Sequence, residues 1–281
     1  MIICRSGSIG WSSSRRVGKD CRMTRALLLN IDDIGIHEGA VGAAVETITD
    51  GPAASGSIMT VCGGTEAAFE LLTDHPEVSV GVHLTLVCDD PRWRWAPLTS
   101  GASIQDDGLL LASSRQAELL ARATAADVAA EFRAQIESAL DAGLRLTHLD
   151  WHCLADGGRE DIFDVSLALA DEYQLAIRAW GDHGRQQVRR SGRIATDQPF
   201  LDSFAVPVEG KEAYFLDRIR NLPVGLTEWA VHPAAPNPED SGSDVRESDH
   251  QALMSTALQQ TIQDEGITVL GYGDQTPQTS R

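Results

Sequence analysis

Hydrophobic runs rich in β-branched residues alternate along the chain with segments whose hydrophobic positions recur at helical spacing. Runs of the first kind are typical of buried parallel strands, and segments of the second kind are typical of helices that cover a sheet. Strands are expected at 26–32, 55–61, 78–87, 145–152, 175–180, 225–233 and 266–273, and helices at 37–50, 65–75, 124–143, 161–173, 211–220 and 245–264. This alternation predicts an α/β fold around a parallel sheet.

The clearest helix is 124–143, where Thr124 can cap the first turn and Gly143 can end the last one. Thr65 is expected to cap a shorter helix in the same way. Residues 88–112 and 181–207 show no regular period. The first of these segments is long for a connection inside one domain, and we interpret it as a loop on the substrate side.

The length of 281 residues fits one large domain, because α/β barrels run to about 250 residues. We expect this domain to span 23–275, since no linker or internal repeat divides the chain. Residues 1–22 lack the hydrophobic core of a secretory signal and are expected to be a disordered extension. Translation could instead begin at Met23, directly before the first strand. Residues 276–281 are expected to be a frayed terminus.

Composition narrows the class of protein. Hydrophobic residues make up 42% and charged residues 23% of the chain, and no hydrophobic run approaches the roughly 18 residues of a membrane span. The net charge of −18 offers no basic stripe, which argues against nucleic acid as a partner. Five cysteines without a CxxC pair indicate reduced thiols and a cytoplasmic protein.

Polar side chains gather where four of the predicted strands end. In parallel α/β folds this edge of the sheet is where active sites form. A single histidine on a strand is more often a core residue than a ligand, but four strands that end in this way favour a site. The residues concerned are Asp32, Asp33, His83, His148, Asp150, His152 and His232.

Two histidines and a carboxylate on separate strands can hold a metal ion and leave positions open for water and a substrate oxygen. His148, Asp150 and His152 share one face of their strand, because side chains alternate along it. Asp32 and Asp33 cannot both point the same way on a regular strand, so one could bind the metal while its neighbour acts as a base. The alternative is that the two aspartates only cap a helix.

Four short motifs carry a resemblance to a known family. They are "NIDDIG" (30–35), "GVHLTL" (81–86), "THLDWH" (147–152) and "VHPA" (231–234). In this order and spacing they resemble the YdjC-like carbohydrate deacetylases, which include chito-oligosaccharide deacetylases and hopanoid-associated relatives. The resemblance runs from about 27 to 272. It implies a distorted (β/α) TIM-like barrel related to polysaccharide deacetylases, with a bound divalent metal ion.

The resemblance also implies roles for single residues. Asp33, His83 and His152 would bind the metal, Asp32 would be the general base, and His232 the general acid. The reaction would remove an acetyl group from an N-acetylated amino sugar of a small oligosaccharide or glycoconjugate. The resemblance points to Mg²⁺, whereas the ligand types also suit Zn²⁺ or another transition metal. Family members are often homodimers.

Residues around this set are expected to support it. Arg178 falls where the family has an arginine near the site, and it could contact the substrate. His148 and Asp150 are expected to form hydrogen bonds behind the ligands. Trp151, with Trp93 and Trp95, could stack on sugar rings, although Trp151 could equally be a core residue on the opposite strand face.

The chain departs from the family in two motifs. Ile31 and Ile34 replace the Ala and Phe of the common NADDFG form, and 153–156 reads "CLAD" where relatives usually have further histidines. The second change leaves two alternatives open. The chain could hydrolyse another amide or ester on the same barrel, or it could be a catalytically silent carbohydrate-binding relative.

Overall fold

The computed structural model describes residues 24–90 and 92–275. The predictions for 1–22 and 276–281 therefore lie outside the described residues. The main sheet is parallel, in the order β8-β7-β3-β2-β1-β10-β9, and β11 also pairs with β1. Its strands are β1 (Arg25–Ile34), β2 (Ser55–Ile58), β3 (Ser79–Leu84), β7 (Leu146–Trp151), β8 (Ala176–Ile177), β9 (Leu201–Asp202), β10 (Gly225–Val231) and β11 (Thr268–Leu270).

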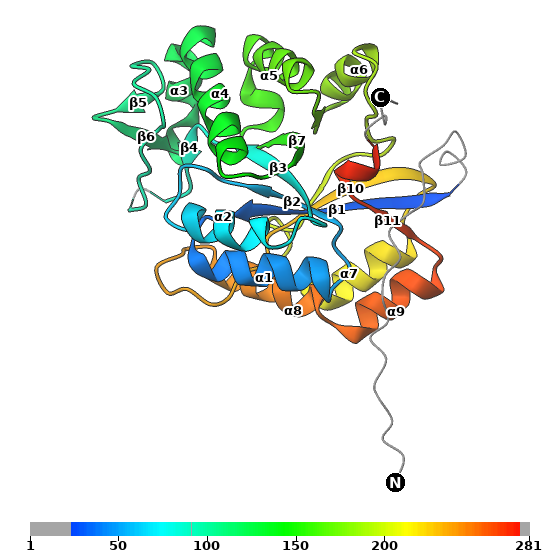
Figure 1. The fold of residues 1–281 in the computed structure, drawn as a ribbon. Helices are drawn as coiled ribbons and strands as arrows, with labels where there is room; N and C mark the ends of the chain where they lie inside the picture. The colour runs from blue at the N-terminus through cyan, green and yellow to red at the C-terminus, as the bar shows by residue number, and fades with distance from the viewer. Residues whose placement is uncertain (1–23, 91, 276–281) are drawn as a thin grey trace.

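Helices lie on both sides of this curled sheet, with α1, α2, α7, α8 and α9 below it and α4 to α6 above it in the view of Figure 1. The end strands β8 and β9 are not paired with each other, so the barrel is incomplete. The expected α/β fold of a distorted barrel is thereby confirmed. The helices are α1 (Glu38–Thr49), α2 (Thr65–Thr73), α3 (Gln116–Arg122), α4 (Ala125–Asp141), α5 (Glu160–Glu172), α6 (Asp182–Arg190), α7 (Lys211–Arg220), α8 (Ser243–Leu253) and α9 (Thr256–Asp264).

The two faces of β1 show how the sequence places the site. Leu27, Leu29 and Ile31 belong to the large core cluster that the helices cover, whereas Leu28 belongs to a small cluster with Leu226 and Leu270 on the other face. Side chains alternate along a strand, so Asn30 and Asp32 follow Leu28 on this inner face. The inside of the barrel is thus hydrophobic where the strands begin and polar where they end.

Four predicted elements differ from the structure. The predicted loop at 88–112 takes part in a small sheet of β4 (Val87–Cys88), β5 (Gln105–Asp106) and β6 (Leu109–Ala112), and 181–207 contains α6 and β9. The long helix predicted at 245–264 is two helices, because Ser255 caps a new one by accepting a bond from the Ala257 N–H. Helix α2 is preceded by Gly64 as its cap, and Thr65 is its first residue.

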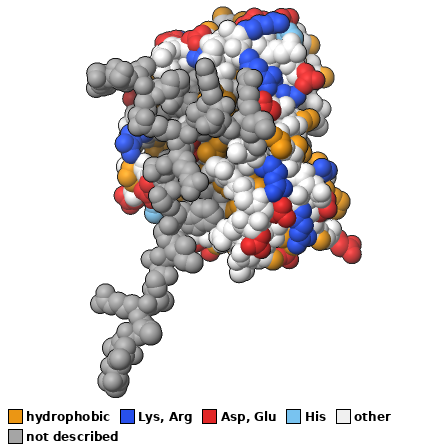
Figure 2. Space-filling view, turned by 90° about the vertical axis from the view of Figure 1, so that its right-hand side faces the viewer, with side chains coloured by type: hydrophobic (Ala, Val, Ile, Leu, Met, Phe, Trp, Pro, Cys, Tyr) orange, Lys and Arg blue, Asp and Glu red, His pale blue; other side chains and the backbone are white. Residues whose placement is uncertain are grey.

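Charges of both signs occur on the face of the molecule that Figure 2 shows. On the face in Figure 2, acidic and basic side chains of the described residues are interspersed and form no continuous basic stripe. None of the helices in the described part of the chain has the length and hydrophobicity that spanning a membrane requires.

Candidate active site

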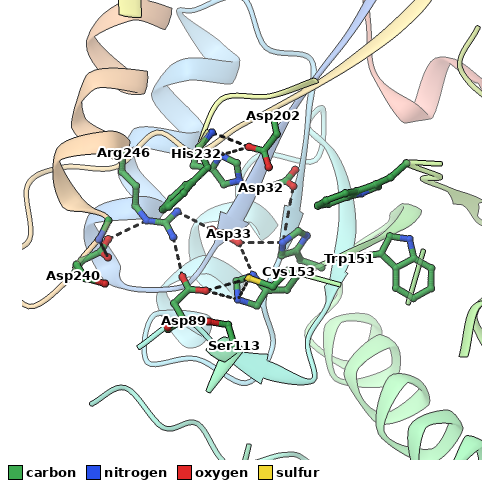
Figure 3. A pocket seen from close by; sticks show the side chains of 16 residues that line it. Asp32, Asp33, Asp89, Ser113, Trp151, Cys153, Asp202, His232, Asp240 and Arg246 are labelled. Carbon is green, nitrogen blue, oxygen red and sulfur yellow. Dashed lines mark hydrogen bonds and ion pairs between the residues drawn. The ribbon is translucent and has the colours of Figure 1, made fainter. Parts of the chain in front are cut away.

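A pocket of about 290 Å³ lies at the carboxyl ends of the strands (Figure 3). It brings together Asp32 and Asp33 near the end of β1, His83 from β3, His152 after β7 and His232 after β10. Five aspartates and a single arginine, Arg246, are among the described residues that line it. This excess of carboxylates gives the pocket a negative potential, which favours the binding of cations.

The Asp32–Asp33 pair is split by an irregularity in β1. The register between β1 and β2 shifts between Ile31 and Ile34, and Asp33 has a φ of 62°, in the left-handed region. Aspartate visits this region at a cost, and such strain persists where the surroundings hold it. The bulge turns Asp33 away from a regular strand position, so both carboxylates reach the same pocket.

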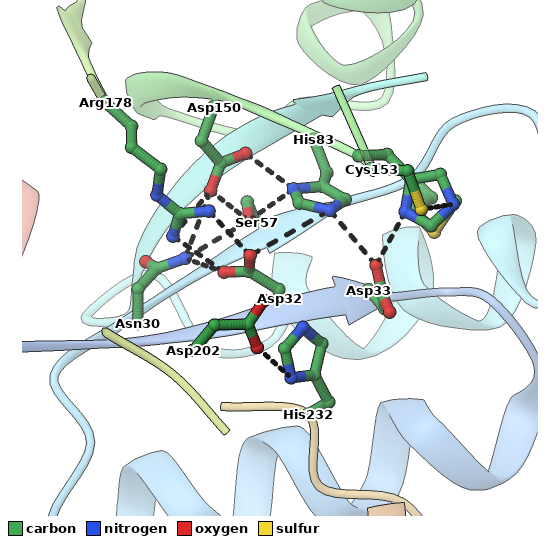
Figure 4. Close-up of polar contacts among 12 residues, drawn as sticks. Asn30, Asp32, Asp33, Ser57, His83, Asp150, Cys153, Arg178, Asp202 and His232 are labelled. Atoms are coloured by element: carbon green, nitrogen blue, oxygen red, sulfur yellow. Dashed lines mark hydrogen bonds and ion pairs between the residues drawn. The ribbon is translucent and has the colours of Figure 1, made fainter. Parts of the chain in front are cut away.

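The three predicted ligands converge on one point. Asp33 Oδ1 lies 3.1 Å from His83 Nε2 and 3.0 Å from His152 Nδ1 (Figure 4). Two ligand atoms at right angles on an ion with bonds of about 2.1 Å would be about 3.0 Å apart. The donor set and its spacing therefore fit a divalent metal ion.

The charges of these groups are strongly coupled. Burial would raise the pKa of Asp33, but Arg246 and His152 outweigh it and hold this pKa well below its usual range. Burial would likewise lower the pKa of His83, yet Asp150 and Asp32 raise it to about 9. A proton on His83 is thus held by carboxylates that would equally stabilise a metal ion in its place.

Asp150 contacts one of the three predicted ligands from behind. Its Oδ1 is 2.8 Å from His83 Nδ1, and its Oδ2 accepts a hydrogen bond from Ser57 Oγ at 2.6 Å. Nδ1 of His83 is therefore tied to a carboxylate, which leaves Nε2 to face Asp33.

His148 lies deeper in the barrel. It stacks on Tyr272 at a centroid distance of 3.9 Å, and burial lowers its pKa to about 3. Its imidazole lies against Gly81, where an added Cβ would come within 2.5 Å of the ring atoms. A glycine is therefore required at position 81 to make room for this side chain.

Arg178 does not lie on the substrate side. Its side chain is fully buried, and its two terminal nitrogens donate to both oxygens of Asp32 at 2.6 and 2.7 Å. Its Nε donates to Glu228 at 2.7 Å. The geometry gives Arg178 a positioning role for Asp32 in place of the substrate contact expected from the sequence, because a buried guanidinium has no surface left for a sugar.

His232 belongs to a second polar chain. Asp249 accepts a short hydrogen bond from the Ser203 hydroxyl, so Ser203 Oγ can only accept from His232 Nδ1, 3.1 Å away. Lys211 Nζ donates to the other oxygen of Asp249 at 2.6 Å. Nδ1 of His232 therefore carries a proton, and Nε2 is the nitrogen on the side of Asp32 (Figure 4).

Trp151 lines the pocket, but the residue is 1% exposed and its indole packs against Phe132 and Phe163. It therefore offers no free face to a sugar ring, and the core alternative fits its position. Trp93 and Trp95 pack into a small hydrophobic cluster, with Trp95 against the His152 ring. The aromatic rings that do face the pocket are Trp180 and Phe204, the latter 39% exposed.

Several residues of the site were missed in the sequence. Arg246 contacts Asp33 at 2.8 Å, Asp89 at 3.2 Å and Asp240 at 3.0 Å. Asp89 Oδ1 lies 2.8 Å from His152 Nε2. Asp89 comes from the 88–112 segment, Arg246 from α8 and Asp240 from the loop before α8, and no local pattern marks them. Asn30 donates a hydrogen bond to Asp32 at 2.8 Å, and it could have been found, because it lies two positions before Asp32 on the same strand face.

Comparisons with known proteins identify relatives of this chain. A carbohydrate deacetylase of Brevibacillus brevis is 29% identical over 259 residues, which cover 88% of this chain and 98% of that protein. One of Thermus thermophilus is 30% identical over 256 residues, 85% of this chain and 89% of that protein. A solved structure from Enterococcus faecalis V583, for which cellobiose-phosphate cleavage has been suggested, has a TM-score of 0.77 at 23% identity. It covers 90% of this chain and 100% of its own, and supports the fold alone.

The family model described as YdjC-like protein matches residues 26–264, a range that contains every residue of the pocket. The chain belongs to the YdjC-like family.

Proposed function

We propose that this protein is a metal-dependent hydrolase that removes the acetyl group from an N-acetylated amino sugar of a small oligosaccharide or glycoconjugate. The observation that carries the proposal is the convergence of Asp33, His83 and His152 beside Asp32, with His232 facing them (Figure 4). The relatives are named carbohydrate deacetylases, and these names are the basis for proposing a carbohydrate substrate and an acetyl group.

The ligand residues would hold a divalent ion, Mg²⁺ by family resemblance and Zn²⁺ or another transition metal by ligand type. Such an ion supplies a Lewis acid that polarises the acetamide carbonyl and lowers the pKa of a water molecule. Asp32, held by both terminal nitrogens of Arg178, is oriented to take a proton from the attacking water.

His232 completes the reaction at the nitrogen. The C–N bond breaks with its electron pair on nitrogen, which is a poor leaving group unless it takes up a proton. His232 Nε2 would donate that proton, while Ser203 and Asp249 fix the ring through Nδ1. The products are acetate and a free amino sugar.

The pocket volume bears on the size of the substrate. Ligand sites span about 300 to 1,000 Å³, so about 290 Å³ is small. We propose that one N-acetylated ring enters the pocket, with Trp180 and Phe204 at its walls, and that any further sugars remain outside.

Acetate release from a panel of N-acetylated mono- and oligosaccharides tests the proposal. Asp32→Asn should lower kcat by about 10² to 10⁴, the usual contribution of a general base. Asp164→Asn is the matched control, because Asp164 is exposed on α5, and it should leave kcat unchanged. Release of other acids, or cleavage of esters only, would favour a different hydrolase on the same barrel. No release from any substrate, with sugars still bound, would favour a silent carbohydrate-binding protein.

A cytoplasmic location and a homodimer remain predictions of the sequence. Cell fractionation and light scattering of the purified protein would test them.

A further inference from the structure

A second group of potential metal ligands lies on the other side of the His152 ring. Asp89 Oδ1 is 2.8 Å from His152 Nε2, and Cys153 Sγ is 3.5 Å from each of these atoms. The three donor atoms thus face one another, in the same way as those of Asp33, His83 and His152. All three residues line the pocket.

The two groups use different atoms of the residue that they share. His152 directs Nδ1 to Asp33 and Nε2 to Asp89, so neither nitrogen has to serve both groups. The two oxygens of Asp89 also have different partners. Oδ2 contacts Arg246 at 3.2 Å, while Oδ1 faces the sulfur of Cys153 and the imidazole of His152. The second group is therefore a separate set of donor atoms.

The local charge favours a further cation. Three carboxylates, those of Asp33, Asp89 and Asp240, share a single guanidinium, that of Arg246, at 2.8 to 3.2 Å, so negative charge is in excess here. In the metal-free protein His152 Nε2 and the Cys153 thiol both contact Asp89 Oδ1, and a metal ion would take the place of the protons between these atoms. Cys153 is exposed, so an ion from solvent can reach it.

We propose that Asp89, His152 and Cys153 form a second divalent-metal site that selects thiophilic ions such as Zn²⁺ or Co²⁺. A thiolate, an imidazole and a carboxylate are ligands that Zn²⁺ favours, whereas Mg²⁺ prefers oxygen ligands. When both sites are filled, His152 bridges them through its two nitrogens. The thiol proton and the ring protons that the ions replace go to solvent.

Cys153 directly follows the motif "THLDWH", where the resemblance to the family leads us to expect a further histidine. The inference concerns binding only and does not depend on the proposed deacetylation.

Titration of the full-length, chelator-stripped and reduced protein with Co²⁺ tests the site. A charge-transfer absorption band between thiolate and Co²⁺ reports sulfur ligation, and the first site holds no sulfur. We expect two Co²⁺ per chain and a thiolate band in the wild type. Excess Mg²⁺ should leave the thiolate band in place.

Substitutions assign the ligands. Cys153→Ser should remove the thiolate band and reduce the stoichiometry from two Co²⁺ to one, and Asp89→Asn should weaken the ion that gives the band. Cys62→Ser is the matched control and should keep both the band and two ions, since Cys62 Sγ lies against Met59. Asp33→Asn should lose one ion but keep the band. A wild type without a thiolate band at saturating Co²⁺, or a band that survives in Cys153→Ser, would overturn the proposal.

Discussion

Replacing Arg178 by methionine is the perturbation whose effect the structure specifies best. Methionine fills a similar volume but removes a fully buried guanidinium from contact with Asp32, Asp150 and Glu228. Phe200 also loses the cation that lies 5.0 Å from its ring centre. Three buried carboxyl groups would then lack their shared positive charge.

The expected loss of stability follows from these partners. Removing one member of a buried ion pair costs about 3 to 5 kcal/mol, because the other charge stays buried. For Arg178→Met we expect a loss of stability at the lower end of this range. Burial already raises the pKa of Glu228, so this carboxyl group takes up a proton readily, and Asp150 keeps His83 as a partner. A loss of about 3 kcal/mol lowers the Tm of a domain of this size by about 6 to 12 °C.

Urea and thermal unfolding of Arg178→Met and wild type measure this loss. Arg190→Met is a suitable control, because Arg190 is exposed at the end of α6, and its stability should change by less than about 0.5 kcal/mol. The stability of Arg178→Lys should lie between those of Arg178→Met and the wild type, since lysine keeps the charge but cannot bind both oxygens of Asp32. If the free energy of unfolding of Arg178→Met lies within about 1 kcal/mol of the wild-type value, the buried ion pairs of Arg178 do not stabilise the fold to the extent expected here.

Three further predictions concern the groups behind the metal ligands. Asp150→Asn should weaken Mn²⁺ binding about 10- to 100-fold in calorimetry, because His83 loses its carboxylate partner, and unchanged affinity would contradict this. In the metal-free protein, the pKa of His83 is raised from 6.5 to about 9. The protonated side chain therefore contributes up to about 3 kcal/mol to the free energy of unfolding, and this contribution is complete below pH 6.5. This contribution is lost as the pH rises through about 9, so the stability difference between wild type and His83→Gln in chelator should narrow from pH 6 to pH 10; a constant difference would refute it. Gly81→Ala should destabilise by about 1 to 3 kcal/mol in urea, since its Cβ would come within 2.5 Å of His148, and an unchanged midpoint would argue against this contact.

Local sequence patterns predicted much of this fold because each strand has its own alternation. The alternation that places His148, Asp150 and His152 on one face also assigns Trp151 to the opposite face, where the structure has it. The break between α8 and α9 was missed because hydrophobic spacing continues through the Ser255 cap.

The site was predictable only where a residue ends a strand in a recognisable motif. Arg246, Asp249 and Asp89 contact the site from distant segments, and no local period marks such contacts. The burial of Arg178 has a similar cause, since its partners Asp32 and Glu228 lie 146 and 50 positions away. Long-range ion pairs of this kind depend on tertiary packing, which a single sequence does not display.

The most direct test of the account separates the roles of the two neighbouring aspartates. Bound metal and acetate release should be measured together for Asp32→Asn and Asp33→Asn, with a Mn²⁺-loaded wild type as reference. The account predicts that Asp32→Asn keeps the ion but loses acetate release, whereas Asp33→Asn loses both. Acetate release that survives in Asp33→Asn without bound metal, or an ion lost from Asp32→Asn but kept by Asp33→Asn, would contradict it.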